Sequence, residues 1–461
     1  MARVKNMTQG NPYTLILSFA IPLMLGNVCQ QLYTVADTAI VGKFVGVEAL
    51  AAVGAAAWPV WFIPGILQGL SQGMTVLPTQ QFGAGDLDGM NRSNAMTLLI
   101  CGAAGILLMV VGLGISESLM ILLNTTEDLL PDSLAYFRIM LYGTIPVTLY
   151  NVFACFLRAM GDGRTPLMSM LVASAVNIIL DLVFILVFHW GVAGAAWATV
   201  ISQVISCVPC VYALRRIPVI DFSRPVWKFD GRLMGRLLRI GAPLGILKLI
   251  IGVGGLIVQS VVNGFGVLLV AGYTAATRLE GVLDIAATSF GFAMVTYTGQ
   301  NLGANRYDRI RLGTRAGSRM AVLIAALIAV VMFVFGKPIL SLFISGEPEV
   351  QDQVLQIGYE CLCVMSAALF IQYLLWVYRS ILQGLGDTVT PMVSGIVEMI
   401  MRMIAVLFLP LMIGEKSVYF AEPAAWIGAV AVLITVYYIH ASKFPKNVGT
   451  EEKKEESSVS Q

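Results

Sequence analysis

The sequence predicts an all-α polytopic membrane protein with twelve transmembrane helices in two pseudo-symmetric six-helix bundles. First, 57% of the 461 residues are hydrophobic and only 12% are charged, whereas a soluble chain carries about 25% charged residues. Second, the chain contains twelve apolar runs that are long enough to cross a bilayer. Third, segments of the first half recur in the second half at nearly constant spacing. The composition excludes a soluble enzyme.

The apolar runs are expected to be helices because lipid offers no partner for backbone N–H and C=O groups. Strands of a membrane barrel would alternate in polarity over about ten residues, which these runs do not do. The first helix follows a polar start and is too long for a signal peptide, so we expect it to remain in the mature protein. The predicted helices are 13–41, 47–77, 92–115, 131–157, 165–188, 191–213, 236–264, 268–300, 316–341, 353–382, 389–413 and 421–441.

Lys and Arg residues predict the orientation. Of the 29, we assign 22 to one side of the membrane, in the N-terminus, the loops around Arg92, Arg158–Arg164, Arg215–Arg239, Arg306–Arg319 and Arg379, and the tail. Lys43, Lys337 and Lys416 fall in the opposite loops. Positively charged loops stay in the cytoplasm, so both termini are expected there, with the chain in the cell membrane. The basic residues follow a membrane face and do not indicate nucleic-acid binding.

The second half repeats the first. Leu157-Arg-Ala-Met-Gly-Asp-Gly-Arg-Thr-Pro166 aligns with Leu382-Gln-Gly-Leu-Gly-Asp-Thr-Val-Thr-Pro391, and Phe82-Gly-Ala-Gly-Asp aligns with Leu302-Gly-Ala-Asn-Arg. Pro22 matches Pro243. Two parallel repeats are one way to build alternating access. The predicted organisation is an N-terminal lobe at 1–214, a loop at 215–239, a C-terminal lobe at 240–441 and a disordered tail at 442–461.

Ionisable residues within the first lobe predict an ion site. Asp37 and Asp181 lie inside apolar helices, where a charge is costly and marks function by default. Asn177 precedes Asp181 by four residues and therefore shares its helix face. Thr199 and Asn151 lie at similar membrane depth. Carboxylate, amide and hydroxyl oxygens suit Na⁺, and the same cluster would also bind a proton. A hydrogen-bonded cluster that merely joins helices is the structural alternative.

In the second lobe, three positive and three negative residues attract attention: Lys248, Arg278, Glu280, Asp284, Glu398 and Arg402. Their charges balance, and structural pairing is the expected role of most of them. Lys248 is expected instead to be a charge in the substrate path.

Pro22 removes a helix hydrogen bond and permits a bend in the helix that carries Asp37. All seven cysteines lie in apolar helices, and Cys207-x-x-Cys210 lacks the second pair of a metal site.

The sequence resembles the multidrug and toxic compound extrusion (MATE) family over roughly residues 10–441. The resemblance rests on Gln31-Leu-Tyr-Thr-Val-Ala-Asp37, on Gly-Gln-Asn-Leu-Gly-Ala at 299–304, and on the two Gly-Asp-x-x-Thr-Pro turns. It implies export of cationic or amphipathic small molecules by antiport against Na⁺ or H⁺, without another cofactor or metal. It also implies the prokaryotic branch with its ion site in the N-terminal lobe, formed here by Asp37, Asn177, Asp181 and Thr199.

The resemblance leaves the cargo open. Other members carry an acid on the seventh helix, where this chain has Lys248, so anionic or zwitterionic cargo also has to be considered. The candidate cavity residues are Tyr33, Asn151, Lys248 and Glu280. A flippase for lipid-linked oligosaccharides or precursors is the alternative function, although it would be expected to place several Arg in its cavity. The chain lacks a zinc-protease, serine-hydrolase or ATP-binding motif, which argues against an enzyme or a primary pump. One chain supplies both lobes, so a monomer in contact with membrane lipid suffices.

Overall fold

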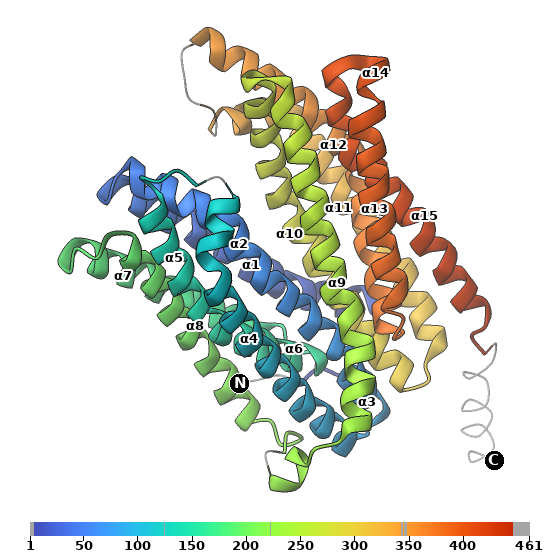
Figure 1. Cartoon of the computed structure of the whole chain (residues 1–461). Helices are drawn as coiled ribbons and strands as arrows, with labels where there is room; N and C mark the ends of the chain where they lie inside the picture. The colour runs from blue at the N-terminus through green and yellow to red at the C-terminus, as the bar shows by residue number, and fades with distance from the viewer. Residues whose placement is uncertain (1–3, 124, 222, 343, 345–347, 446–461) are drawn as a thin grey trace, which may run out of the picture. The chain divides into compact units, whose positions relative to one another are not determined.

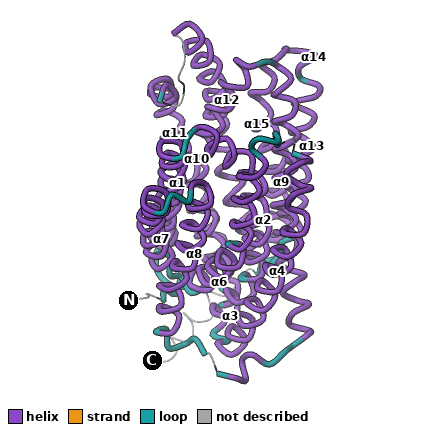
Figure 2. The backbone as a smooth tube through the Cα atoms, turned by 60° about the vertical axis from the view of Figure 1, so that its left-hand side comes forward, coloured by secondary structure: helices purple, strands orange, loops and turns teal. Residues whose placement is uncertain are grey.

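The computed structural model describes residues 4–123, 125–221, 223–342, 344 and 348–445. Throughout these residues the regular structure is helical, and Figure 2 shows helices joined by short loops without a strand. The predicted all-α fold is confirmed. Most of the tail predicted to be disordered, residues 446–461, lies outside the described part of the chain.

The first half of the chain forms six membrane-spanning segments, which Figure 1 shows in blue to green. Two of them consist of two consecutive α-helices, since α2 ends at Met74, before Thr75, and α5 ends at Tyr142, before Gly143. The helices are α1 (Pro12–Phe44), α2 (Val47–Met74), α3 (Val76–Ala84), α4 (Leu87–Leu122), α5 (Leu130–Tyr142), α6 (Thr144–Ala159), α7 (Arg164–Leu182), the π-helical η1 (Val183–Val187) and α8 (Gly191–Arg215).

The second half follows a short 3₁₀ turn, η2 (Arg224–Trp227), and also forms six spans. Its last apolar stretch, Val389–Ser442, is one continuous helical run but contains two long helices joined by short helical turns. The described residues therefore hold twelve spans. The elements are α9 (Gly231–Val262), η3 (Asn263–Phe265), α10 (Val267–Gly303), α11 (Tyr307–Ser341), α12 (Pro348–Gly384), α13 (Val389–Phe408), α14 (Pro410–Ile413), η4 (Gly414–Phe420) and α15 (Ala421–Ser442).

The repeated turns have the same local structure in both halves. Asp162 accepts hydrogen bonds from the backbone N–H and the hydroxyl of Thr165, at 3.0 and 2.6 Å. Asp387 makes the same two bonds to Thr390, also at 3.0 and 2.6 Å. The glycine before each aspartate has a positive φ, which glycine adopts without steric cost. Each motif thus ends one transmembrane helix and begins the next.

The other repeated turn also agrees between the halves. Gly85 and Asn305 occupy equivalent positions and both adopt left-handed backbone, with φ of 75° and 56°. In each case the next N–H donates to a carbonyl five residues back, from Asp86 to Gln81 and from Arg306 to Asn301. The structure therefore supports the duplication inferred from the sequence.

The chain divides into two compact units. Unit 1 comprises Met1–Asn6 and Ile21–Ile246, and unit 2 comprises Met7–Ala20 and Leu247–Gln461. The division passes through α1 beside Pro22 and through α9 shortly after Pro243. The loop at 215–239 groups with unit 1, and the start of α1 groups with unit 2.

Close helix contacts inside unit 1 depend on glycine. A Cβ atom on Gly73 of α2 would lie 2.6 Å from the Cα atom of Gly241 of α9. The two backbones can approach this closely because neither residue carries a side chain, as is common between membrane helices. In unit 2, α10 packs along α12, and α13 packs along α15 (Figure 1).

Candidate functional site

The four predicted ion-site residues come together inside unit 1. Asp37 lies on α1, Asn177 and Asp181 lie on α7, and Thr199 lies on α8. The side chains of Asn177 and Asp181 are fully buried, and Asp37 is 8% exposed. Asn177 donates its amide N–H to the hydroxyl oxygen of Thr199 at 3.3 Å. The carboxyl groups of Asp37 and Asp181 lie within electrostatic range of each other.

Several buried oxygen atoms of this cluster lack a donor among the described residues. They are Asp37 Oδ1, Asn177 Oδ1, both carboxylate oxygens of Asp181, and Gln203 Oε1. Leaving a buried acceptor unpaired costs about 1–3 kcal/mol, and neighbouring carboxylates add mutual repulsion. A bound cation or proton would relieve both costs. The donor set therefore fits Na⁺ or H⁺, since both are held by oxygen atoms.

Two further residues belong to this region and were not predicted. Gln203 lies four residues after Thr199 on α8, so both side chains occupy one helix face, and its side chain interacts with Tyr33. Tyr136 on α5 is 6% exposed and lies within electrostatic range of both Asp37 and Asp181. Uncharged polar residues inside apolar runs carry no charge signal, so the sequence did not single them out.

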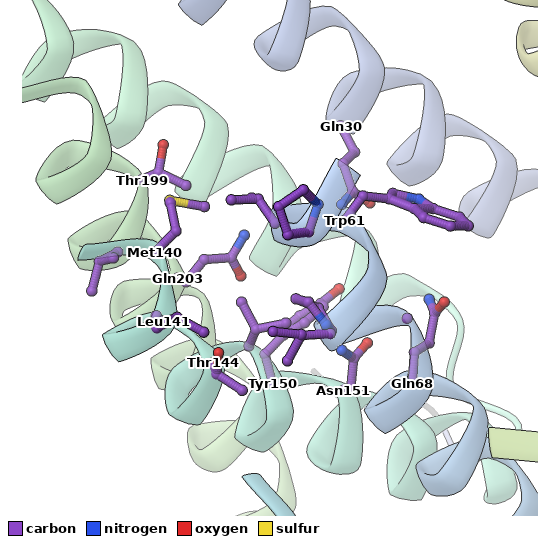
Figure 3. A pocket seen from close by; sticks show the side chains of 18 of the residues that line it. Gln30, Trp61, Gln68, Met140, Leu141, Thr144, Tyr150, Asn151, Thr199 and Gln203 are labelled. Carbon is purple, nitrogen blue, oxygen red and sulfur yellow. The ribbon is translucent and has the colours of Figure 1, made fainter. Parts of the chain in front are cut away.

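A cavity of about 300 Å³ adjoins the cluster. Figure 3 shows its wall, with Gln30, Trp61, Gln68, Met140, Tyr150 and Asn151 around the space and with Thr199 and Gln203 on α8. No charged side chain lines it among the described residues. Amide and hydroxyl groups from several helices converge there, together with aromatic rings, an arrangement typical of small-molecule sites.

The predicted cavity residues separate into two groups. Tyr33 and Asn151 line the cavity of unit 1, and Thr199 belongs to both the cavity wall and the ion cluster. Lys248 and Glu280 instead lie in unit 2, on α9 and α10, and both are half-buried. Pro22 lies within α1, which continues as a helix through that position.

Several charged residues of unit 2 form a buried ion-pair network. Glu398 accepts from Arg379 at 2.7 Å and from Arg402 at 3.4 Å, and Arg402 also bonds Glu422 at 2.7 Å. The pairing expected for Glu398 and Arg402 is confirmed. Arg278 is exposed and takes no part in this network.

Arg379 was wrongly assigned to a cytoplasmic loop. It lies inside α12, is 2% exposed and pairs with Glu398. The sequence did not indicate this pair, because the anionic partner lies nineteen residues away and on another helix, α13.

Comparison with known proteins identifies relatives over most of the chain. The MatE family model matches residues 22–183 and 243–408, so each stretch begins at one of the two repeated prolines. The probable multidrug resistance protein YpnP of Bacillus subtilis (strain 168) is 31% identical over 348 residues, covering 75% of this chain and 77% of the relative. A FAD transporter of Shewanella oneidensis is 26% identical and covers 73% of this chain and 75% of its own length.

Solved structures share the fold. A crystal structure of MATE in the straight conformation has a TM-score of 0.88 at 23% identity and covers 96% of this chain and 99% of its own. At this identity the likeness concerns the fold.

Proposed function

The chain belongs to the MatE family of membrane transporters, and we propose that it exports amphipathic small molecules in exchange for Na⁺ or H⁺. The observation that carries the proposal is the set of unpaired buried oxygens around Asp37 and Asp181. In a membrane interior such groups require a cation or a proton. An ion gradient is then available as the energy source.

The coupling rests on Thr199. Its hydroxyl accepts from Asn177 in the ion cluster, and its side chain also lines the cavity. An ion that draws Asn177 and Asp181 together changes the hydrogen bonding of a cavity wall residue. Antiport requires that ion and cargo bind the two conformations with different affinity. We propose that ion binding lowers the affinity of the cavity for cargo, with α1 bending near Pro22.

The proposed cargo is a small molecule with an apolar body and hydrogen-bonding groups. The cavity of unit 1 offers amide groups and aromatic rings without a fixed charge, so it does not reject either sign of cargo by direct repulsion. YpnP is named as a probable multidrug resistance protein, which supports drug-like cargo. The relative named as a FAD transporter supports anionic cargo as well.

The proposed location is the cell membrane with both termini in the cytoplasm. The excess of Lys and Arg on one side supports this orientation, and it remains when Arg379 is removed from the count. Both repeats are present in one chain, which supports a monomer surrounded by lipid as the working unit.

Drug accumulation in living cells tests the proposal. We would express the protein in a bacterial host that lacks its own efflux pumps and measure the intracellular level of a fluorescent cationic dye and of a flavin. The expected result is lower accumulation of at least one of them with the wild type than with Asp37→Asn. Equal dye and flavin accumulation with the wild type and with Asp37→Asn would contradict the proposal. Altered surface sugars in cells depleted of this protein would then favour a flippase.

A further inference from the structure

The segment that joins α8 to α9 is strongly basic and is held in place on unit 1. Residues 215–239 contain seven Lys and Arg residues and two acids. Asn91 of α4 donates its amide N–H to the carbonyl oxygen of Val219 at 2.9 Å and accepts from the backbone N–H of Asp221 at 3.2 Å. Val226 of η2 is 9% exposed and belongs to the hydrophobic core of this unit. The segment therefore has a defined position on unit 1.

The start of α9 is amphipathic. The residues that pack against the core of unit 1 are Leu233, Leu237 and Ile240. The residue before each of these is an exposed arginine, namely Arg232, Arg236 and Arg239. Residues spaced four and three positions apart share one helix face, so the arginines form a continuous row. Lys228, which is also exposed, precedes the helix, and we call these four cationic residues the basic stripe.

The basic stripe has no anionic partner within the protein. None of its four side chains forms an ion pair in the part of the chain that the structure describes. Asp221 accepts instead from the backbone N–H and the hydroxyl of Ser223, both at 2.7 Å. Asp230 accepts from the backbone N–H groups of Arg232 and Leu233 at 3.0 and 3.1 Å, and so caps the first turn of α9. Four cations without a counter-charge attract an external anion.

The length of α9 places the basic stripe at the membrane surface. Its 32 residues extend over about 48 Å, whereas the hydrocarbon core of a bilayer is about 30 Å thick. At least one end of α9 therefore reaches the headgroup layer, and the charged end is the one that hydrocarbon excludes. Phe229, directly after Lys228, is 73% exposed. An exposed aromatic ring beside basic residues is typical of the membrane–water interface.

We propose that the basic stripe and Phe229 bind the phosphate headgroup of an anionic phospholipid in the cytoplasmic leaflet. Guanidinium groups hold phosphate oxygens in bidentate geometry, and the phenyl ring contacts the boundary between headgroup and acyl chain. The choice of leaflet rests on the proposed orientation of the chain, whereas the contact itself does not depend on ion-driven export. Because α9 passes from unit 1 into unit 2 between Ile246 and Leu247, the lipid binds a helix that belongs to both units.

Lipid binding to the purified full-length protein tests the proposal. We would measure, in detergent, the dissociation constants of fluorescent phosphatidylglycerol and of fluorescent phosphatidylcholine with the same acyl chains. The wild type should bind phosphatidylglycerol at least about a hundredfold more tightly, since each basic residue near the headgroup contributes about fivefold. Arg232→Gln/Arg236→Gln should weaken phosphatidylglycerol binding by about 25-fold and leave phosphatidylcholine binding unchanged. About 500 mM NaCl should remove most of the difference between the lipids by screening.

Lys43→Gln/Lys337→Gln is the matched control. It removes two exposed positive charges near the C-terminal ends of α1 and α11, so the net charge changes equally, and phosphatidylglycerol binding should stay at the wild-type value. Phe229→Ala should weaken the binding of both lipids, whereas Phe229→Trp should retain it. Because every substituted side chain is exposed, each variant should elute as monodisperse protein with the melting temperature of the wild type.

Two results would overturn the inference. Equal loss of phosphatidylglycerol binding in the arginine variant and in the lysine control would show a general attraction to net charge. Displacement of the lipid by inorganic phosphate at constant ionic strength would assign the basic stripe to a soluble anion. Failure here is distinguishable from failure of the proposed function, because Asp37→Asn should lose gradient-driven export but bind phosphatidylglycerol as the wild type does.

Discussion

Asn177 donates its amide N–H to Thr199 across 3.3 Å, and this contact joins the buried carboxylate cluster to the wall of the cavity. Asn177 is fully buried, whereas Thr199 is half-buried. The two helices α7 and α8 thereby bring a residue of the proposed ion site and the wall of the proposed cargo cavity within one hydrogen bond.

Thr199→Val should weaken ion binding without unfolding the protein. Valine preserves the shape of the side chain but cannot accept from Asn177, so a buried amide N–H loses its partner at a cost of about 1–3 kcal/mol. Because part of this cost destabilises the ion-bound state, we expect the apparent ion affinity in transport to fall by about tenfold. Thr199→Ser retains the hydroxyl and should restore it. An unchanged ion dependence of transport in Thr199→Val would contradict the role of this contact.

Asn151→Asp should change the charge preference of the cavity. The variant places a carboxylate in a wall that carries no charged side chain in the described structure, so cationic cargo is attracted and anionic cargo is repelled. Relative to the wild type, we expect the KM for a cationic dye to fall and the KM for an anionic dye to rise. Each change should be several-fold, which corresponds to a binding free energy of about 1 kcal/mol. Asn151→Leu removes the amide group without adding a charge and serves as the control, which should raise both KM values. An equal response of both dyes to Asn151→Asp would place the residue outside the cargo path.

Glu398→Gln should destabilise unit 2 strongly. Glu398 bridges Arg379 and Arg402 in a buried position, and removing the charge leaves a buried guanidinium without compensation at a cost of about 3–5 kcal/mol. Thermal unfolding in detergent measures the effect. Lys416→Gln breaks the pair with Glu360, in which the lysine side chain is 63% exposed, and should cost less than about 1 kcal/mol. Similar losses in the two variants would show that the buried network contributes no more than a surface pair.

Gly73→Ala should destabilise unit 1. The added Cβ atom would lie 2.6 Å from the backbone of Gly241, so α2 and α9 must separate, and overpacking of this kind costs about 1–3 kcal/mol. Gly235 on α9 has no atom within 4 Å of an added Cβ atom, so Gly235→Ala is the matched control and should be neutral or slightly stabilising. The melting temperatures of the two variants in detergent give the comparison, and equal values would contradict the close helix contact.

Long apolar runs made the fold predictable, because their length and their lack of charge leave helices as the expected spanning structure. The ends were less predictable. The prediction began the ninth span at residue 316, but α11 begins at Tyr307, because the first turns of this helix are rich in Arg and fall outside an apolar window. The π-helical turn Val183–Val187 is made of ordinary apolar residues, so nothing in its sequence marks it.

The candidate site was predictable where it carries charge. Asp37 and Asp181 are conspicuous inside apolar helices, and the spacing of four residues predicts that Asn177 shares the helix face of Asp181. Gln203 was missed because a neutral amide is unremarkable in a membrane helix until its unpaired oxygen is seen in three dimensions. The partners of Arg379 were also invisible in the sequence, since Glu398 is brought to it by the packing of α13 against α12.

The central claim is that the carboxylate cluster of unit 1 couples an ion gradient to cargo export. The most direct measurement uses purified protein in liposomes loaded with a fluorescent cationic dye, with a Na⁺ gradient and then a pH gradient imposed on the wild type, Asp37→Asn and Glu117→Gln. Glu117 is an exposed acid in unit 1 that pairs with Arg138 at 3.7 Å, so its variant controls for loss of a negative charge. We predict dye movement driven by at least one gradient in the wild type and in Glu117→Gln, and none in Asp37→Asn. Gradient-driven movement at the wild-type rate in Asp37→Asn would contradict the claim.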